Sequence, residues 1–358
     1  MYSPLPALLD QPSLERIRTR PCPHCSLCGA EGEPLYEGLK DRLFGVPGTW
    51  NFKRCPKPSC GLLWPGPMPL EEDIGKAYRS YYTHQDGLPL PNNFVRRIYS
   101  RVRSGYLRSK YNFRCIRRSR WWDLLLKNLL YLHPPRRESI DSGVFWLKST
   151  PNGRLLEVGC GSGSILQSMN KLGWQAEGVD FDPAAVELAR RKGLTVHLGT
   201  LTEPKLPENT FDTIAASHFI EHVADPIGIL RECHRLLKPG GLLVLITPNA
   251  RSWWHRLYRG DWRGLEPPRH LRIFTRSALA AGCTQAGFDH GDCRSIVRAN
   301  TILLEGRIMQ GADDADSVRR GSWTHRLWTE VTGLLQWAVS LVDREAGEEL
   351  VLIAAKEP

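Results

Sequence analysis

From residue 154 onward, short apolar runs alternate with segments whose apolar residues recur at helical spacing. The apolar runs predict strands at 155–158, 176–179, 195–198, 211–217 and 242–246. The segments between them predict helices at 164–172, 183–192 and 227–237, and a Lys-Pro-Gly-Gly turn stands at 238–241. The run 242–246 is apolar throughout, which is typical of a central strand in a parallel sheet. The alternation predicts an α/β fold with a doubly wound parallel sheet.

The rest of the chain is less regular. A helix is expected at 271–288, an apolar helix at 323–342 and a last strand at 350–354. Before the sheet, arginine-rich segments with helical spacing predict two or three helices, which Pro134-Pro135 should end. The expected organisation is an extended or disordered N-terminus at 1–20, a Cys-rich module at 21–69, a basic helical connector at 70–150 and the α/β domain at 151–358. Within that domain we expect an aromatic lid at 250–275 and a helical insertion at 310–345.

Composition limits the class of protein. The chain has 358 residues, 41% of them hydrophobic, which is ample for a globular core and suggests two domains. Ten cysteines in a chain of this length do not indicate a disulfide scaffold. No secretory signal pattern and no 18-residue apolar run is visible, because Glu330 and Gln336 interrupt the stretch 327–342. We therefore expect a reducing, cytoplasmic compartment.

The first predicted strand runs into three alternating glycines, Gly159, Gly161 and Gly163. Glycine is needed where a backbone turns tightly and approaches a ligand. Asp180 ends the next strand, where a carboxylate can accept both hydroxyls of a ribose. The narrow Gly-x-Gly-x-Gly spacing and the acidic Glu157 before it argue against a pyrophosphate and favour a cation. S-adenosylmethionine carries two cationic groups, an ammonium and a sulfonium.

These segments resemble, in order, the motifs of class I S-adenosylmethionine-dependent methyltransferases, especially the ubiquinone O-methyltransferase type. The matching pieces are residues 157–163, Asp180, Phe211-Asp212, Glu221-His222-Val223, residues 237–241 and Thr247-Pro248-Asn249. The resemblance covers about a quarter of the chain. It implies a mostly parallel, seven-stranded Rossmann-like sheet with S-adenosylmethionine as the cofactor.

The resemblance also implies which residues contact the cofactor. They are Glu157, Gly159, Cys160, Gly161, Gly163, Asp180, Phe181, Thr200, Leu201 and Ser217. The three glycines would line the methionine part, Glu157 would face its amino group and Asp180 would hold the ribose. The Thr200-Leu201 pair would lie against the adenine.

The candidate catalytic residues are His218, His222 and His270. His218 and His222 follow the fourth strand at the edge of the sheet where ligands bind, and helical spacing would bring Glu221 onto their side. One hypothesis is a general base, a second is a divalent metal site and a third is support of the loop. Ubiquinone-pathway O-methyltransferases, which this segment resembles, carry a carboxylate in place of His218, which weakens the metal hypothesis.

The segment 251–274 is aromatic and contains Arg269 beside His270. It stands where this superfamily builds its acceptor lid, and its aromatic walls and cations would suit a polar or anionic acceptor. The alternative is an aromatic mini-core beneath a long loop.

Four thiols, those of Cys25, Cys28, Cys55 and Cys60, stand as two knuckle-like pairs, each followed by glycine. Four thiolates match a structural, tetrahedral Zn²⁺ site without an open position. Cys22 also forms a C-x2-C spacing with Cys25, so the choice within this group stays open. The module is similar to N-terminal zinc modules of bacterial methyltransferases from sugar and cell-envelope pathways.

The net charge of +10 is local, because residues 94–120 hold ten Arg or Lys and no Asp or Glu. The alternatives are a solvated helical face, contact with a membrane surface or anionic lipid, and a nucleic-acid patch. A membrane contact would place the protein at the inner membrane face.

The combined features predict in-line methyl transfer from S-adenosylmethionine to a small-molecule acceptor. A sugar, a lipid-linked glycan and a quinone-like hydroxyl or amine are the candidate acceptors. The alternative is an RNA methyltransferase that grips the backbone with the zinc module and the basic helices. The oligomeric state is left open.

Overall fold

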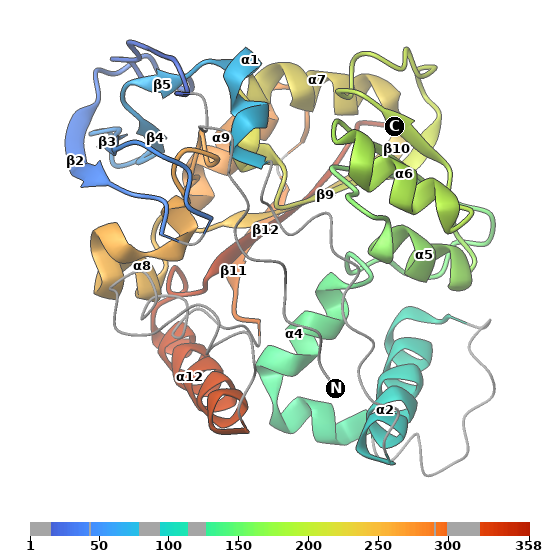
Figure 1. The fold of residues 1–358 in the computed structure, drawn as a ribbon. Helices are drawn as coiled ribbons and strands as arrows, with labels where there is room; N and C mark the ends of the chain where they lie inside the picture. Colours follow the sequence, from blue (N-terminus) through green and yellow to red (C-terminus); the bar gives the residue numbers. More distant parts are fainter. Residues whose placement is uncertain (1–15, 43, 79–93, 114–126, 290, 299–322) are drawn as a thin grey trace, which may run out of the picture.

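Seven strands form one central sheet in the order β11-β12-β10-β9-β6-β7-β8 (Figure 1). The computed structural model describes residues 16–42, 44–78, 94–113, 127–289, 291–298 and 323–358. The strands are β6 (Arg154–Val158), β7 (Gln175–Asp180), β8 (Val196–Leu198), β9 (Phe211–Ser217), β10 (Leu237–Pro248), β11 (Asp292–Ile296) and β12 (Glu349–Ala355). Only β12 runs antiparallel to its neighbours β10 and β11. The expected mostly parallel, seven-stranded sheet is confirmed.

The helices that follow β6, β7, β9 and β10 begin at side-chain caps, except α5, whose N-cap is Gly163. They are α5 (Ser164–Lys171), α6 (Pro183–Arg191), α7 (Pro226–Leu236), α8 (Trp253–Tyr258) and α9 (Arg276–Gln285). Asp182 and Asp225 cap α6 and α7, and a proline follows each cap at the first helical position. The prediction of a helix from residue 271 is wrong, because Thr275 caps α9 and Ile273 pairs instead with Leu63 of the N-terminal module.

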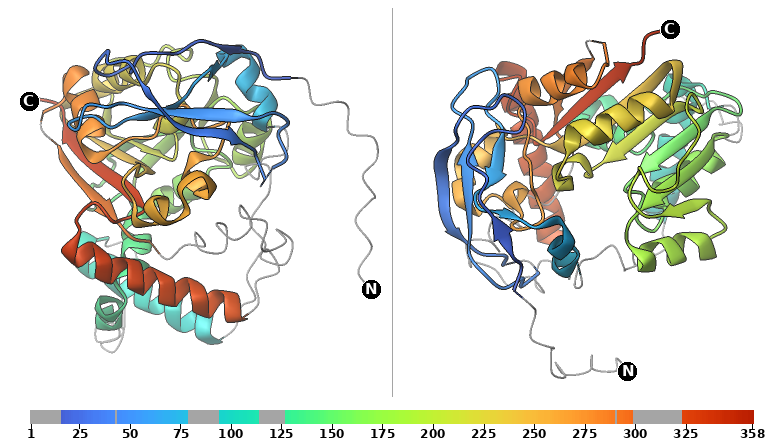
Figure 2. Two further views of the ribbon diagram at one scale, coloured as in Figure 1. Left: turned by 90° about the vertical axis from the view of Figure 1, so that its left-hand side faces the viewer. Right: turned by 90° about the horizontal axis from the view of Figure 1, so that it is seen from above.

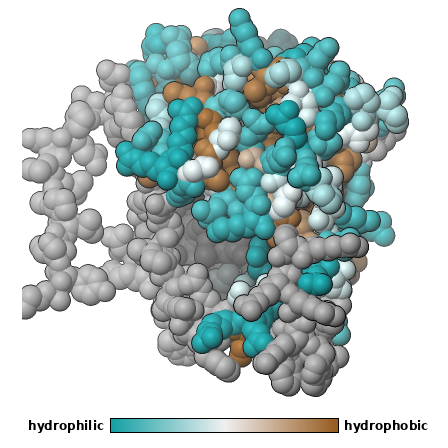
Figure 3. Space-filling view, turned by 90° about the vertical axis from the view of Figure 1, so that its right-hand side faces the viewer, coloured by the Kyte–Doolittle hydropathy of each residue, from teal (hydrophilic) through white to brown (hydrophobic). Residues whose placement is uncertain are grey.

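Side chains alternate across the sheet and build two cores. Leu156, Ile214 and Leu245 face α7 and α9, whereas the neighbouring Leu155 and Val244 face α5 and α6. The helices on both faces make the sheet doubly wound, as expected. The outer surface seen from the α5 and α6 side is mainly hydrophilic, with apolar residues in scattered patches (Figure 3).

The N-terminal module covers the α7–α9 side of the sheet (Figure 2). Its strands are β1 (Thr19–Arg20) with β5 (Met68–Pro69), and β2 (Glu33–Leu39), β3 (Trp50–Arg54) and β4 (Leu63–Pro65). Leu62 and Trp64 belong to the same core cluster as the sheet. The module is therefore stabilised by burial against the α/β domain. Residues 1–15 lie outside the described residues, and 19–20 are extended.

Helices α2 (Phe94–Tyr111), η3 (Lys127–Leu132), α4 (Pro134–Ser142) and α12 (Trp323–Val342) lie at the opposite end of the molecule from the module's strands (Figure 1). The short helices α1 (Glu71–Ile74) and η1 (Gly75–Tyr78) lead out of the module, and α1 lies beside it. As predicted, the helix before Pro134-Pro135 ends there, at Leu132, but the same prolines also begin α4, where their missing N–H groups cost nothing. Residues 114–126 and 299–322, which the sequence assigns to the connector and the helical insertion, lie outside the described residues. Within the described chain, no helix is long and apolar enough to cross a membrane.

Candidate cofactor and acceptor site

The glycine loop joins β6 to α5, and its three glycines are required for different reasons. All three have positive φ, which disfavours any side chain. A Cβ on Gly159 would come within 2.7 Å of Phe219, and one on Gly163 within 2.4 Å of Leu194. These two glycines are required by packing within the protein. A Cβ on Gly161 would meet no heavy atom within 4 Å, so the space beside Gly161 is open.

Asp180 turns its carboxylate toward this loop. Its Oδ2 accepts the N–H of Gly161 at 2.7 Å, and its Oδ1 accepts the N–H of Asp182 at 2.9 Å. Burial raises the pKa of Asp180, and these backbone donors offset part of that shift. Each carboxylate oxygen keeps a second lone pair for a ligand hydroxyl.

Glu157 lies in β6 just before the loop and is only 4% exposed. Its Oε2 has no hydrogen-bond partner among the described residues. Burial raises its pKa to about 8, the negative charge of Asp180 adds to the rise, and the N–H of Leu166 offsets part of it. A buried carboxyl oxygen without a partner is costly, so this position suits a ligand cation.

The residues expected around the adenine differ in exposure. Phe181 is 45% exposed, and the edge of its ring packs against Tyr78 at 5.4 Å between centroids. Thr200 is exposed, but Leu201 is 1% exposed within the core and offers almost no surface to an adenine. Cys160 is buried at the loop, and Ser217 is half-buried at the end of β9.

His218 lies between two carboxylates just beyond β9. Its Nδ1 is 3.3 Å from Glu221 Oε1 and its Nε2 is 3.1 Å from Glu349 Oε1. Its φ of 52° places it in the left-handed region. Burial lowers its pKa, but Glu349 and Glu221 outweigh burial and raise the pKa to about 9. His218 is therefore an imidazolium at neutral pH.

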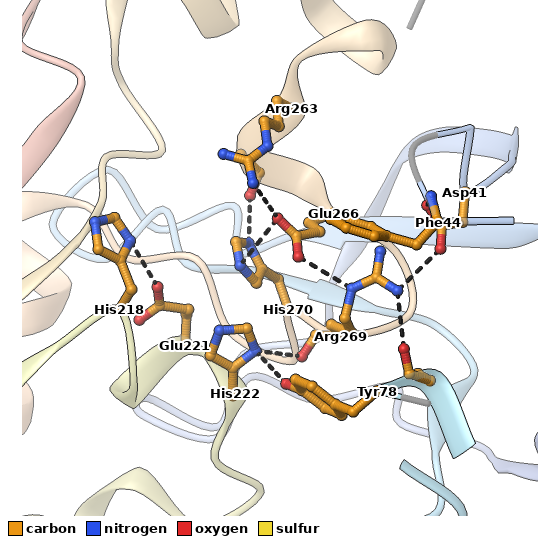
Figure 4. A network of polar contacts seen from close by, with 12 residues as sticks. Asp41, Phe44, Tyr78, His218, Glu221, His222, Arg263, Glu266, Arg269 and His270 are labelled. Carbon is orange, nitrogen blue, oxygen red and sulfur yellow. Dashed lines mark hydrogen bonds and ion pairs between the residues drawn. The ribbon is translucent and has the colours of Figure 1, made fainter. Parts of the chain in front are cut away.

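His222 and His270 converge on Glu221 in the network that Figure 4 shows. One ligand atom from each of the three residues lies within 4.8 Å of the others. The Nδ1 of His222 is 3.1 Å from the carbonyl oxygen of Arg269, and that of His270 is 2.7 Å from the carbonyl oxygen of Gly264. Because a carbonyl only accepts, the Nδ1 of His270 carries hydrogen and its Nε2 keeps a lone pair, whereas the Nδ1 of His222 also meets the hydroxyl of Tyr78, which can donate as well as accept. Burial lowers the pKa of His270 to about 4, which keeps it neutral.

Most of the aromatic segment expected to form a lid is a buried core. Trp254 and Trp262 are 3% and 0% exposed and cluster with Phe52 of the module. Arg269, fully buried, pairs with Asp41 of the module at 2.9 Å and with Glu266 at 3.0 Å. The expectation that Arg269 offers its charge to an acceptor is therefore wrong, and His270 is likewise buried. The mini-core alternative describes these residues.

The four predicted cysteines come together in the module. The sulfurs of Cys25 and Cys60 are 3.7 Å apart, and those of Cys28 and Cys55 are 3.4 Å apart. All four sulfurs lie within 4.8 Å of one another, and Cys22 is outside the group. A tetrahedral zinc ion with bonds of ~2.3 Å needs sulfurs about 3.8 Å apart. The geometry fits such an ion and favours the pair Cys25 and Cys28 over the pair Cys22 and Cys25.

Three polar residues of the site were missed by the sequence analysis. Tyr78 places its hydroxyl 2.7 Å from His222 Nδ1, and Arg298 contacts both His218 and Glu349. Glu349 begins the antiparallel strand β12, which brings it to the edge where β9 and β10 end. The Glu-Glu pair before the last apolar run was the only sequence signal for it.

Comparison with known proteins identifies relatives of this chain. The family described as "Methyltransferase domain" matches residues 117–290. The ubiquinone biosynthesis O-methyltransferase of Hahella chejuensis is 30% identical over 220 residues, which cover 55% of this chain and 86% of that protein. The chain belongs to the class I S-adenosylmethionine-dependent methyltransferases.

Two further similarities extend the comparison of this methyltransferase. The enzyme of the same description from Xanthomonas oryzae pv. oryzae (strain PXO99A) is 37% identical over 140 residues, or 37% of this chain. The chain spans 57% of the length of that relative. An S-adenosylmethionine-dependent methyltransferase structure from Mesorhizobium loti is 17% identical, with a TM-score of 0.44, and the match covers 61% of this chain and 97% of that one.

Proposed function

We propose that the protein transfers a methyl group from S-adenosylmethionine to a hydroxyl group of a small-molecule acceptor. The observation that carries the proposal is the buried carboxyl group of Glu157, whose Oε2 has no partner among the described residues, beside the open space at Gly161 and the carboxylate of Asp180. This arrangement suits a ligand that has a cation at one end and a ribose at the other. The relatives described as ubiquinone biosynthesis O-methyltransferases support a small-molecule hydroxyl as the acceptor over RNA.

The cofactor would be held by residues already described. Glu157 would pair with the ammonium, Asp180 would accept the ribose hydroxyls, and the exposed ring of Phe181 would flank the adenine. The activated methyl group comes with the cofactor, so the protein's main task is to align the acceptor at ~3–3.5 Å and exclude water.

His218 and His222 have different roles in this proposal. Because His218 is already protonated at neutral pH, it would orient an electronegative acceptor rather than act as a base. His222 is half-buried, and with its hydrogen on Nδ1 it would receive the acceptor proton at Nε2. Tyr78 and the carbonyl of Arg269 hold the ring of His222 in place. Buried His270 would support that ring.

A divalent metal ion is the second candidate for this cluster. Glu221, His222 and His270 offer one carboxylate and two imidazoles, a donor set that fits such an ion. When bound, the metal would act as a Lewis acid on the acceptor oxygen. A chelator that removes activity while Zn²⁺ stays in the cysteine site would favour this alternative over His222 as base.

We also propose that Cys25, Cys28, Cys55 and Cys60 bind a structural zinc ion. The sulfur separations support tetrahedral coordination, and four protein ligands leave no open position for chemistry. The small module has few core residues of its own, so the ion would stabilise it.

The experiment is transfer of a labelled methyl group from S-adenosylmethionine into a fractionated cell extract. We expect label in a small-molecule fraction, and none with the variant Asp180→Ala. Label in RNA instead would favour the RNA alternative. The absence of any label, together with no cofactor binding by the wild-type protein, would refute the proposed function.

A further inference from the structure

Helix α12 turns its polar side toward the protein, the reverse of an ordinary surface helix. Its polar Gln336 is 1% exposed, accepts the indole N–H of Trp254 at 3.0 Å and donates to the carbonyl of Ala346 at 3.0 Å. Thr332 is also buried, and Glu330 pairs with His133 of α4 at 2.8 Å. A helix at a protein–water boundary normally turns its apolar side inward. Here the polar side is turned inward.

The outward side of α12 is apolar. Its large exposed residues are Leu327, Trp328, Val331, Leu335, Leu341 and Val342. At the ~100° per residue of an α-helix, they fall on one arc of about 140°. The other residues of 327–342 on that arc are Leu334 and Ala338, so the arc carries no polar side chain. We call these eight residues the α12 stripe.

The α12 stripe lies at the same end of the molecule as the basic helix α2 (Figures 1 and 2). Arg136 of α4 pairs with Glu330 of α12 and also interacts with Tyr99 of α2, which places the three helices together. Ten of the thirteen large hydrophobic residues exposed in the described chain belong to α2, η3 and α12. The apolar exposure is therefore concentrated at this end.

This end of the protein is also cationic. Arg97 and Arg101 are on the exposed side of α2, and the whole segment 94–120 contains no acidic residue. An apolar arc with a tryptophan beside a basic helix is the pattern of an interfacial surface, in which apolar side chains enter the headgroup boundary and arginines contact anionic lipids.

We propose that the α12 stripe and α2 dock the protein on the surface of an anionic lipid bilayer. The contact is peripheral, since no described helix is long and apolar enough to span a membrane. A second copy of this chain fits less well, because symmetric pairing through α12 would bring two basic α2 helices toward each other. The proposal does not depend on the methyl acceptor.

The test is co-sedimentation of the full chain with lipid vesicles. We expect binding to vesicles of phosphatidylcholine with phosphatidylglycerol, and much weaker binding to phosphatidylcholine alone. The double variant W328S/L335S should lose about tenfold or more in affinity, since two apolar side chains leave the interface. Arg97→Gln should lose about fivefold on anionic vesicles only. The matched control is Leu257→Ser, which removes an equally exposed apolar residue from α8.

A second measurement uses a variant that keeps the surface of α12 apolar. Brominated lipids should quench wild-type tryptophan emission, and Trp328→Phe should remove most of that quenching while vesicle binding persists. Failure of the wild-type protein to bind anionic vesicles would overturn the proposal, as would equal losses in the α12 and Leu257 variants. If the wild-type protein is a dimer in solution, does not bind vesicles and is dissociated by W328S/L335S, the α12 stripe contacts a second copy of the chain instead.

Discussion

Replacement of Glu157 by glutamine tests whether the buried carboxyl is kept for a cation. The substitution preserves size and removes the charge. The wild-type carboxyl has a pKa of about 8 in the folded protein because it is buried. In the unfolded chain the pKa is ~4.3. The folded state therefore binds more protons than the unfolded state between these values, and its stability falls as the pH rises through that window.

The size of this effect follows from the two pKa values. At ~1.36 kcal/mol per unit, ionisation costs the folded wild-type protein about 3 kcal/mol between pH 4.5 and pH 7 as an upper estimate. E157Q has no such dependence. The difference in unfolding free energy between E157Q and wild type should therefore rise toward that value over this window. Comparing the slopes of unfolding free energy against pH for the two proteins removes the constant cost of burying the amide.

The charge of Glu157 destabilises the free folded protein but should strengthen binding of the cofactor. At pH 7 most of the Glu157 carboxyl is protonated, so pairing with an ammonium must release about one proton. Calorimetry between pH 6 and 7, in two buffers that differ in ionisation enthalpy, measures that proton while the cofactor's amino group (ordinary pKa ~7.7–8.0) stays charged. E157Q should release none and bind about 10- to 100-fold more weakly.

The reasoning would be refuted by a variant that binds S-adenosylmethionine as tightly as wild type with the same proton release. It would also fail if the stabilities of the two proteins changed in parallel between pH 4.5 and 7.

Three further predictions concern other parts of the molecule. Zinc analysis should give one ion per chain, lost in Cys25→Ser but retained in Cys22→Ser, and chelation should lower the melting temperature of the wild type and leave the Cys25 variant unchanged. The pKa of His218 is raised from 6.5 to about 9. The contribution of its protonated imidazole to folding stability is therefore complete below pH 6.5 and disappears as the pH rises through 9. His218→Asn, which tolerates the positive φ, should remove that pH dependence in unfolding experiments, and an NMR titration of His218 near pH 6.5 would contradict it. Arg269→Ala removes the buried guanidinium that Asp41 and Glu266 share and leaves Glu266 with only Arg263 as a cationic arginine partner, so denaturant unfolding should show a loss of about 3–5 kcal/mol, whereas a loss below 1 kcal/mol would show the cluster to be unimportant.

The sheet was predictable because its signals are local. Apolar runs, capping residues and the glycine loop each predict one element, and the order of those elements fixes the doubly wound sheet. The exception among the strands is β11, Asp292–Ile296, whose Asp-Cys-Arg-Ser-Ile sequence lacks an apolar alternation. It is formed at the edge of the sheet by pairing with β12.

The acceptor side was less predictable because its contacts join distant segments. Tyr78 meets His222 across 144 positions, and Arg269 meets Asp41 across 228. A basic residue next to an aromatic run looks the same in sequence whether it binds a ligand or an internal carboxylate. Only burial distinguishes the two cases, and it shows Arg269 to be internal.

The central claim is that the open space at Gly161, between Glu157 and Asp180, binds S-adenosylmethionine. Isothermal titration of the wild-type protein and of Asp180→Ala with the cofactor tests this claim most directly. We predict one binding site per wild-type chain and no detectable binding by a variant that retains the wild-type circular dichroism spectrum. Unchanged affinity in the folded variant, or no binding by the wild type, would contradict the account.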